Sequence, residues 1–221
     1  MSDKKKKPSW LQSIWQKKFA LIAIALLIAL LPMAVTKETV VLSKTLLTAI
    51  GIERDGTGFA VHGEALIFNF DPFGIQEREV WSATADTIEE CLTIIGRNRG
   101  RTVSLSHCTI ILLSEDMLTD TLTDDLRYLL DRTDLNNSCV LFPTDVPVDD
   151  LLHASRERGD ARSALLQQIG TFNRMRDNHF VGTTLERFYM DMLGKNATSK
   201  IGLIGLQDGE IINDGSYKTL Q

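Results

Sequence analysis

Residues 103–132 read VSLSHCTIILLSEDMLTDTLTDDLRYLLDR and contain the strand and the helix around which the chain is arranged. Residues 109–113 (TIILL) form an apolar run rich in β-branched side chains, typical of a strand buried on both faces. Ser114 and the two acids behind it predict the start of a helix. Leucines then recur every three or four residues, which predicts one amphipathic helix, at Leu118, Leu122, Leu126, Leu129 and Leu130. A buried strand followed by a surface helix is the core unit of an α/β domain, and we expect the acids of the helix to be solvated.

The charge of the chain is distributed unevenly. Of 24 basic and 29 acidic residues, residues 1–35 hold six lysines and one aspartate, which leaves 18 basic and 28 acidic residues, a net charge of −10, in the remainder. Such an acidic body is unsuited to binding nucleic acid or an anionic membrane surface. Hydrophobic residues make up 43% of the chain and charged residues 24%, as in an ordinary globular protein.

The N-terminal segment predicts a membrane anchor. Residues 19–35 (FALIAIALLIALLPMAV) carry no charge and are just long enough to form a transmembrane helix. The lysines of residues 1–18 place the N-terminus in the cytoplasm and the body outside it. A cleaved signal peptide is the alternative, but the long basic segment and the lack of a small-x-small site favour an uncleaved, single-pass anchor. No cysteine follows this span closely, which excludes lipid attachment there.

The remaining patterns predict an α/β (α+β) domain with a mixed sheet and flanking helices. An Asp-Gly turn at residues 54–58 predicts a hairpin. Thr87 with Glu90, and Thr183 with Glu186, have capping-box spacing, and Asp145 is expected to cap a helix that has Pro147 in its first turn. Strands are expected at residues 47–53, 59–68 and 138–142, and helices at residues 87–96, 147–155, 164–172 and 183–193.

Three arginines on one short loop form the candidate binding site. Arg97, Arg99 and Arg101 lie around two glycines, where they could contact an anion or a partner protein. The alternative is a basic helix end followed by a turn, which the negative end of the helix dipole favours. His107 and Cys108 suggest nucleophilic catalysis, but adjacent strand residues point to opposite faces. We therefore expect both to be buried structural residues.

The sequence contains no signal for catalysis, a metal or a cofactor. The three cysteines, Cys91, Cys108 and Cys139, lie inside apolar segments without CxxC spacing or a histidine at a metal-ligand interval. We expect buried thiols, and a single disulfide outside the cytoplasm is the alternative. Because P-loop, dinucleotide-binding and zinc signatures are absent from the sequence, no catalytic residue, cofactor or metal ligand is assigned.

Several segments together resemble the N-terminal domain of the Ger(x)C family, the C subunits of spore germinant receptors. The strongest likeness is in residues 105–132, which are similar to the family's strand, histidine, second strand and following helix. The other similar segments are residues 47–55 (LTAIGIERD), 83–92 (ATADTIEECL), 149–153 (DDLLH) and 183–193 (TTLERFYMDML).

The residue patterns and the resemblance together predict a domain organisation. Residues 1–18 would be a basic cytoplasmic segment, residues 19–35 a transmembrane signal-anchor, and residues 37–200 the extracytoplasmic domain. Residues 201–221 would be a tail, or the start of a second domain that opens with a strand pair whose partners are missing. Members of the family are typically lipoproteins, so the span at residues 19–35 would replace the lipid anchor.

The resemblance also implies a function. We expect a non-enzymatic subunit of a spore germinant receptor-like complex, assembled with polytopic membrane subunits and responding to a small-molecule nutrient indirectly. The alternative is a membrane-anchored extracytoplasmic ligand-binding or hydrolytic domain, with a pocket lined by Arg97, Arg99, Arg101 or His107. A deep pocket with titratable side chains beside His107 would favour that alternative.

Overall fold

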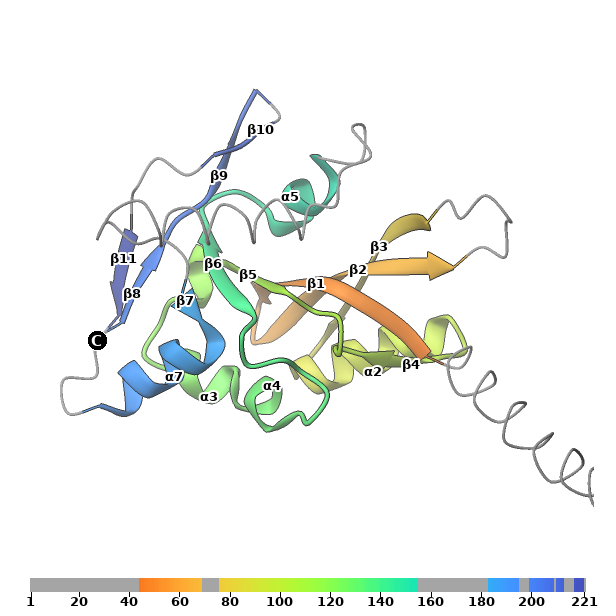
Figure 1. The fold of residues 1–221 in the computed structure, drawn as a ribbon, viewed down its shortest axis with the longest axis horizontal. Coiled ribbons are helices and arrows are strands. Elements are labelled where there is room, and N and C mark those ends of the chain that lie inside the picture. The colour runs from red at the N-terminus through yellow and green to blue at the C-terminus, as the bar shows by residue number, and fades with distance from the viewer. Residues whose placement is uncertain are drawn as a thin grey trace, which may run out of the picture. The chain divides into compact units, whose positions relative to one another are not determined.

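A central mixed sheet organises the part of the chain that the computed structural model describes, residues 44–68, 76–154, 183–194, 199–208, 210–212 and 217–220. Its strands follow the order β3-β2-β1-β5-β6-β7, and β4 pairs with β1 at the end of β1 that β5 does not reach. Figure 1 shows β1 near the middle of this arrangement. The strands are β1 (Lys44–Asp55), β2 (Gly58–Phe68), β3 (Gln76–Ala85), β4 (Thr102–Ser104), β5 (Ile110–Ser114), β6 (Val140–Thr144) and β7 (Thr183–Thr184).

The first three strands form an antiparallel meander, which confirms the predicted hairpin. β1 and β2 are joined by a tight turn in which Gly56 has a φ of +60°, a conformation that favours glycine. β1 begins at Lys44, earlier than expected, because residues 44–46 pair in parallel with β4. A local alternation of apolar residues does not reveal such a distant partner.

The other half of the sheet is mainly parallel. β5 pairs in parallel with β1 and β6, and the short β7 closes the edge antiparallel to β6. The apolar run of β5 is buried on both faces, as predicted: Ile110 and Leu112 pack into one core cluster, and Ile111 and Leu113 into the other. Buried strands of this kind need cover on both sides.

The predicted single helix behind β5 is wrong. The chain instead forms a short 3-10 helix, η1 (Glu115–Met117), and two short helices, α3 (Leu122–Asp125) and α4 (Arg127–Asp131). Ser114 does not cap the first turn; its hydroxyl donates to the carbonyl of Ile52 on β1 at 3.3 Å. Around residues 119–125 polar side chains bond to one another: the Thr121 hydroxyl lies 2.9 Å from the Thr119 hydroxyl and donates to Asp125 at 2.9 Å, and these short polar residues favour turns over a continuous helix.

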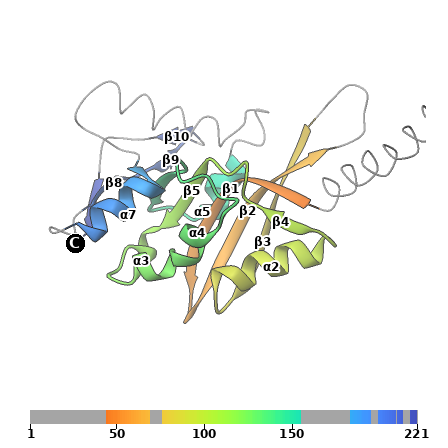
Figure 2. The same cartoon turned by 60° about the horizontal axis from the view of Figure 1, so that its bottom comes forward.

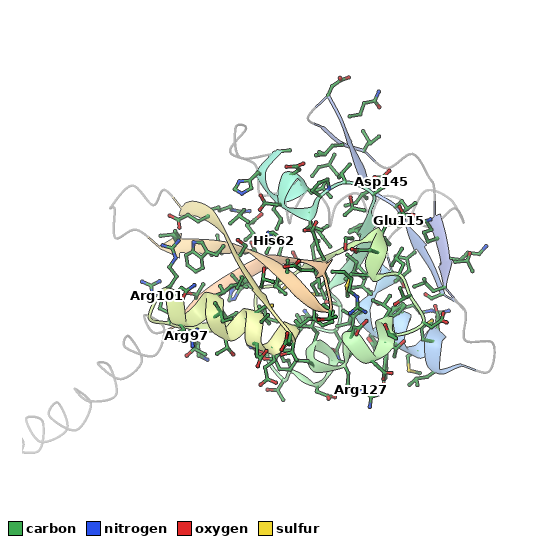
Figure 3. The ribbon with its side chains drawn as sticks, turned by 180° about the vertical axis from the view of Figure 1, so that it is seen from behind. His62, Arg97, Arg101, Glu115, Arg127 and Asp145 are labelled. Atoms are coloured by element: carbon green, nitrogen blue, oxygen red, sulfur yellow. The ribbon has the colours of Figure 1, made fainter. Side chains whose placement is uncertain are left out.

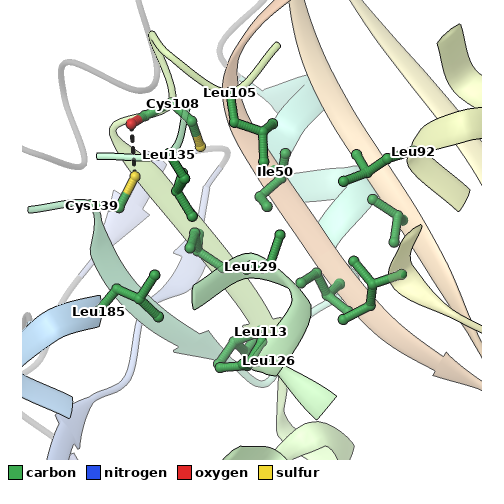
Figure 4. Close-up of a cluster of buried hydrophobic side chains, with 14 of the residues drawn as sticks. Ile50, Leu92, Leu105, Cys108, Leu113, Leu126, Leu129, Leu135, Cys139 and Leu185 are labelled. Carbon is green, nitrogen blue, oxygen red and sulfur yellow. Dashed lines mark hydrogen bonds between the residues drawn. The ribbon is translucent and has the colours of Figure 1, made fainter. Parts of the chain in front are cut away.

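The leucine stripe still reaches the core despite these breaks. Leu122, Leu126 and Leu129 are at most 1% exposed. Figure 4 shows Leu126 beside Leu113 and Leu129 in the middle of the same cluster, which also holds Leu135 and Leu185 of α7 (Leu185–Leu193). The apolar period therefore predicted which residues are buried, although not the path of the backbone between them.

Helices cover both faces of the sheet. Buried residues of α2 (Ile88–Asn98), α3, α4 and α7 share one core cluster, and those of α5 (Val148–Ala154) belong to the second cluster. Figure 1 shows the four helices below the sheet and α5 above it, and Figure 2 shows the four spread across their face. The predicted mixed α+β fold with flanking helices is therefore confirmed for the described residues.

A glycine allows α5 to approach the sheet closely. A Cβ built on Gly51 of β1 would lie 1.8 Å from Cγ1 of Val148, the first residue of α5. The start of this helix is held by β1 as well, because the backbone N–H of Val148 donates to Glu53 Oε1 at 2.6 Å. The prediction that Asp145 caps this helix is therefore wrong: the cap comes from a strand residue far away in the sequence.

The two capping boxes differ in outcome. Thr87 Oγ1 accepts from the Glu90 N–H at 3.2 Å and caps α2 as predicted, and α2 continues beyond Gly96 to Asn98. The second cap is displaced by one residue, because Thr184 accepts from the N–H of Arg187 at 3.2 Å. Thr183 pairs with β6 instead, and this pairing fixes where α7 begins.

The strands near the C-terminus pair with one another. β8 (Ser199–Gly202) pairs with β11 (Tyr217–Leu220), β9 (Gly205–Gln207) pairs with β10 (Glu210–Ile212), and Ile204 forms a bridge to Thr144 of β6. The tail therefore contains paired strands, as expected. Whether residues 201–221 begin a second domain stays a prediction.

Three sequence predictions lie outside the described residues: the basic segment 1–18, the transmembrane span 19–35 and the helix at residues 164–172. Within the described ranges, none of the helices has the length and apolar character needed to cross a bilayer.

Candidate functional site

A pocket of about 310 Å³ lies between the end of α2, the start of β4 and α4. We call it the basic pocket. Three arginines line it together with apolar and small polar residues, and no acidic residue lines it. Figure 3 shows Arg97 and Arg101 at the same end of α2. The lining residues are Leu92, Thr93, Gly96, Arg97, Arg101, Thr102, Val103, Tyr128 and Arg132.

The turn after α2 brings Arg97 and Arg101 to this place. The backbone N–H groups of Arg99 and Arg101 both donate to the carbonyl of Gly96, at 3.1 and 2.9 Å, so the chain folds back over the helix end. Gly100 has a φ of +64°, which this reversal requires and which glycine adopts at little cost. Because a Cβ at Gly96 would lie 2.5 Å from the Arg101 carbonyl, a larger residue would push the returning chain away.

Arg132 forms a fixed wall of the basic pocket. Its Nε and Nη2 donate to the two carboxylate oxygens of Asp134, at 2.7 and 2.8 Å, and its Nη1 donates to the Tyr128 hydroxyl at 2.9 Å. Nη2 also donates to the carbonyl of Val103 at 3.2 Å, which ties the side chain to β4. Such a bidentate arginine–carboxylate pair has a defined orientation.

The same contacts change the ionisation of the pair. The hydrogen bonds from Arg132 lower the pKa of Asp134 to about 2, helped by the N–H of Leu105 and opposed by partial burial. In return, the Asp134 carboxylate raises the pKa of Arg132. The pair therefore stays ionised at neutral pH and is close to neutral in total charge.

The predicted arginine cluster is only partly assembled. Arg97 and Arg101 are exposed, and within the described part of the chain neither forms an ion pair. Arg99 lies apart from the pocket: its guanidinium stacks on the ring of Trp81 at 4.6 Å and approaches Glu79 at 3.4 Å. The structure therefore joins two of the three predicted arginines with Arg132 and Tyr128, which the sequence did not single out.

His107 and Cys108 do not form a catalytic pair. The segment between β4 and β5 is a turn, closed by the Cys108 N–H donating to the Leu105 carbonyl at 2.9 Å. His107 is exposed on this turn and lies 3.1 Å from the Ser106 hydroxyl, so the prediction that it is buried is wrong. Cys108 is buried, as predicted.

All three cysteines are free and buried in the structure, as predicted. The Cys139 thiol donates to the Cys108 carbonyl at 2.7 Å, as Figure 4 shows. The neighbouring Cys139 thiol and burial raise the pKa of Cys108 well above its usual value. Cys108 is therefore a protonated, inaccessible thiol, unlike the thiolates that act as nucleophiles.

A second group of titratable side chains lies at α5, on the opposite face of the sheet. The ring nitrogens of His62 lie 3.4 Å from Glu53 Oε2 and 3.2 Å from Asp149 Oδ1, and Asp149 also approaches His153 at 3.4 Å. These residues come from β1, β2 and α5, so sequence spacing did not reveal them. Within the described ranges, no group of three or more such side chains has a metal-binding arrangement.

Comparison with known proteins gives one match. A family model described as the spore germination protein N-terminal domain matches residues 42–205. These residues include every strand from β1 to β8 and the whole basic pocket. Neither a curated protein nor a solved structure matches the chain.

Proposed function

Because the chain belongs to the Ger(x)C family of spore germination proteins, we propose that it is a non-enzymatic subunit of a germinant receptor-like complex. The observation that carries the proposal is the family match over residues 42–205, which supports a role in spore germination. The family is one of receptor subunits and is not known for enzymes. The proposed subunit acts by holding partners together, not by turning over a substrate.

The proposed setting is the outer face of a membrane. Residues 19–35 serve as the anchor, with residues 1–18 in the cytoplasm and the body outside, as the lysine distribution supports. The partners are polytopic membrane subunits of the same receptor, through which a small-molecule nutrient acts indirectly. Exposed polar positions such as Asp120, Asp124 and Arg97 are the proposed contact surface, since functional contacts concentrate in loops and polar faces.

Gene deletion in a spore-forming host tests this proposal. Deletion should slow nutrient-triggered germination, and a trigger that bypasses the receptors should work as before, because the downstream machinery is untouched. Other receptors are deleted in the same strain so that they do not mask the effect. Reintroducing the wild-type gene should restore the rate; an unchanged nutrient response in that strain would contradict the proposal.

The competing function is a membrane-anchored ligand-binding or hydrolytic domain, and a pocket with titratable side chains beside His107 would favour hydrolysis. His107 does not line the basic pocket, and the adjacent Cys108 is buried. His107→Ala should therefore leave function unchanged in a protein that folds normally. A folded His107→Ala protein that has lost a hydrolytic activity of the parent would move the chain to the enzyme class.

A further inference from the structure

We propose that the basic pocket binds a small organic oxyanion, a carboxylate or a phosphate monoester, whose apolar part lies against Tyr128. This inference does not depend on the germination role. It rests on the charge of the pocket, on hydrogen-bond donors that remain free, and on the size and lining of the space.

The first observation is an unbalanced positive charge. Asp134 neutralises Arg132, but in the described part of the chain no carboxylate pairs with Arg97 or Arg101. Both guanidiniums border a pocket with no acidic lining residue, in a body whose net charge is −10. A local positive potential in an acidic protein selects an anion, and guanidinium matches the geometry of carboxylate and phosphate.

The second observation is a set of donors already held in place. A guanidinium has five N–H donors. Those of Arg132 make four bonds, to Asp134 twice, to Val103 and to Tyr128, which leaves one N–H on Nη1. The Tyr128 oxygen accepts from Arg132, so its own hydroxyl hydrogen remains free to donate. An oxyanion would accept from these two donors with the exposed guanidiniums of Arg97 and Arg101 beside it.

The third observation concerns the size and chemistry of the space. A volume of about 310 Å³ is at the small end of metabolite pockets. Leu92, Val103 and the Tyr128 ring supply apolar surface beside the arginines. An acidic side chain of a partner protein could bind the exposed arginines without entering the pocket. The apolar and aromatic lining is instead suited to a small ligand with about one ring.

Ligand-observed NMR on the purified full-length chain tests the inference. The chain is kept in a zwitterionic detergent, because an anionic one would compete for the site. The probes are benzoate and phenyl phosphate, with benzyl alcohol as the uncharged analogue. At least one of the two anions should bind at millimolar concentration, and whichever binds more tightly identifies the preferred headgroup. Benzyl alcohol should bind at least about tenfold more weakly, because it cannot make charge-assisted bonds.

Matched substitutions assign the binding to the pocket. Arg97→Gln with Arg101→Gln should weaken anion binding at least about tenfold, because two charge-assisted contacts are lost. Arg99→Gln, which removes the same charge from the same loop but outside the pocket, should change binding less than about twofold. Circular dichroism confirms folding of each variant. No binding of either anion to the wild type, or equal loss in the double and the Arg99 variants, would overturn the proposal.

Discussion

Gly51→Ala should destabilise the protein through a collision with α5. The new Cβ would lie 1.8 Å from Val148 Cγ1, whereas non-bonded carbons prefer about 3.5–4.0 Å. Val148 is fully buried, so its side chain has no free space to move into. Overpacking of this kind costs about 1–3 kcal/mol. Alanine also lowers the conformational entropy of the unfolded chain, which stabilises the folded state by about 0.4–1 kcal/mol. We therefore expect the free energy of unfolding to fall by about 1–2 kcal/mol in total.

A double mutant isolates the collision. Val148→Ala alone should cost about 2 kcal/mol, because it removes two buried methyl groups. It also deletes the atom nearest to the new methyl group, leaving Val148 Cβ at 3.1 Å and Leu152 Cδ1 at 3.6 Å. The methyl of Gly51→Ala then occupies space that Val148→Ala vacates. The two changes together should therefore cost about 1–2 kcal/mol less than their sum.

Urea unfolding followed by circular dichroism measures these free energies, with equal slopes required for comparison. Gly56→Ala is the control: its Cβ would meet nothing within 4 Å, but its φ of +60° makes it cost about 1–2 kcal/mol through backbone strain. Val148→Ala should not relieve that cost. Additive effects in the Gly51–Val148 pair would refute the close packing of α5 on β1.

Three further outcomes are expected. Leu126→Asp should cost several kcal/mol, because Leu126 is 0% exposed, whereas Asp124→Asn on the solvated face should change the melting temperature little. The pKa of Asp134 is lowered from 3.8 to about 2, so its ionised form stabilises the folded state. After allowing for partial exposure of the side chain, we expect a contribution of about 1–2 kcal/mol to the free energy of unfolding. This contribution is present above about pH 4 and is lost as the pH falls towards 2. Asp134→Asn should flatten that part of the pH–stability curve in acid titrations. Protease added to intact cells should digest the body and spare the N-terminal lysines, and protection of the body would contradict the proposed topology.

Strands were easier to predict from the sequence than helix boundaries. The run at residues 109–113 and the Asp-Gly turn carry their information locally, and β5 and the β1–β2 hairpin follow them closely. The prediction of one helix behind β5 was wrong because the spacing of the leucines indicates only which residues are buried. The polar residues around Thr121 determine whether the backbone stays helical. The start of α5 could not be predicted, since Glu53 caps it from a strand that only the tertiary fold brings near.

The basic pocket shows the same limit. Arg97 and Arg101 could be picked out because they are close in sequence on a glycine-containing loop. Arg99 was grouped with them for the same reason, but the turn directs it towards Trp81. Arg132 was not singled out although Tyr128 and Asp134, which orient it, are near it in sequence, because its place in the pocket depends on how α4 packs beside β4, where it bonds to the Val103 carbonyl.

The buried cysteines offer a kinetic probe of the fold that needs no added label site. A buried thiol reacts with an alkylating reagent only when the surrounding structure opens, so the labelling rate reports local unfolding. Cys91 donates to the Phe59 carbonyl on β2, and Cys139 donates to the Cys108 carbonyl beside the parallel strands. Equal alkylation rates at Cys91 and Cys139 would mean that the antiparallel and parallel halves of the sheet open as one cooperative unit. Faster reaction at one of them would identify the half that opens first.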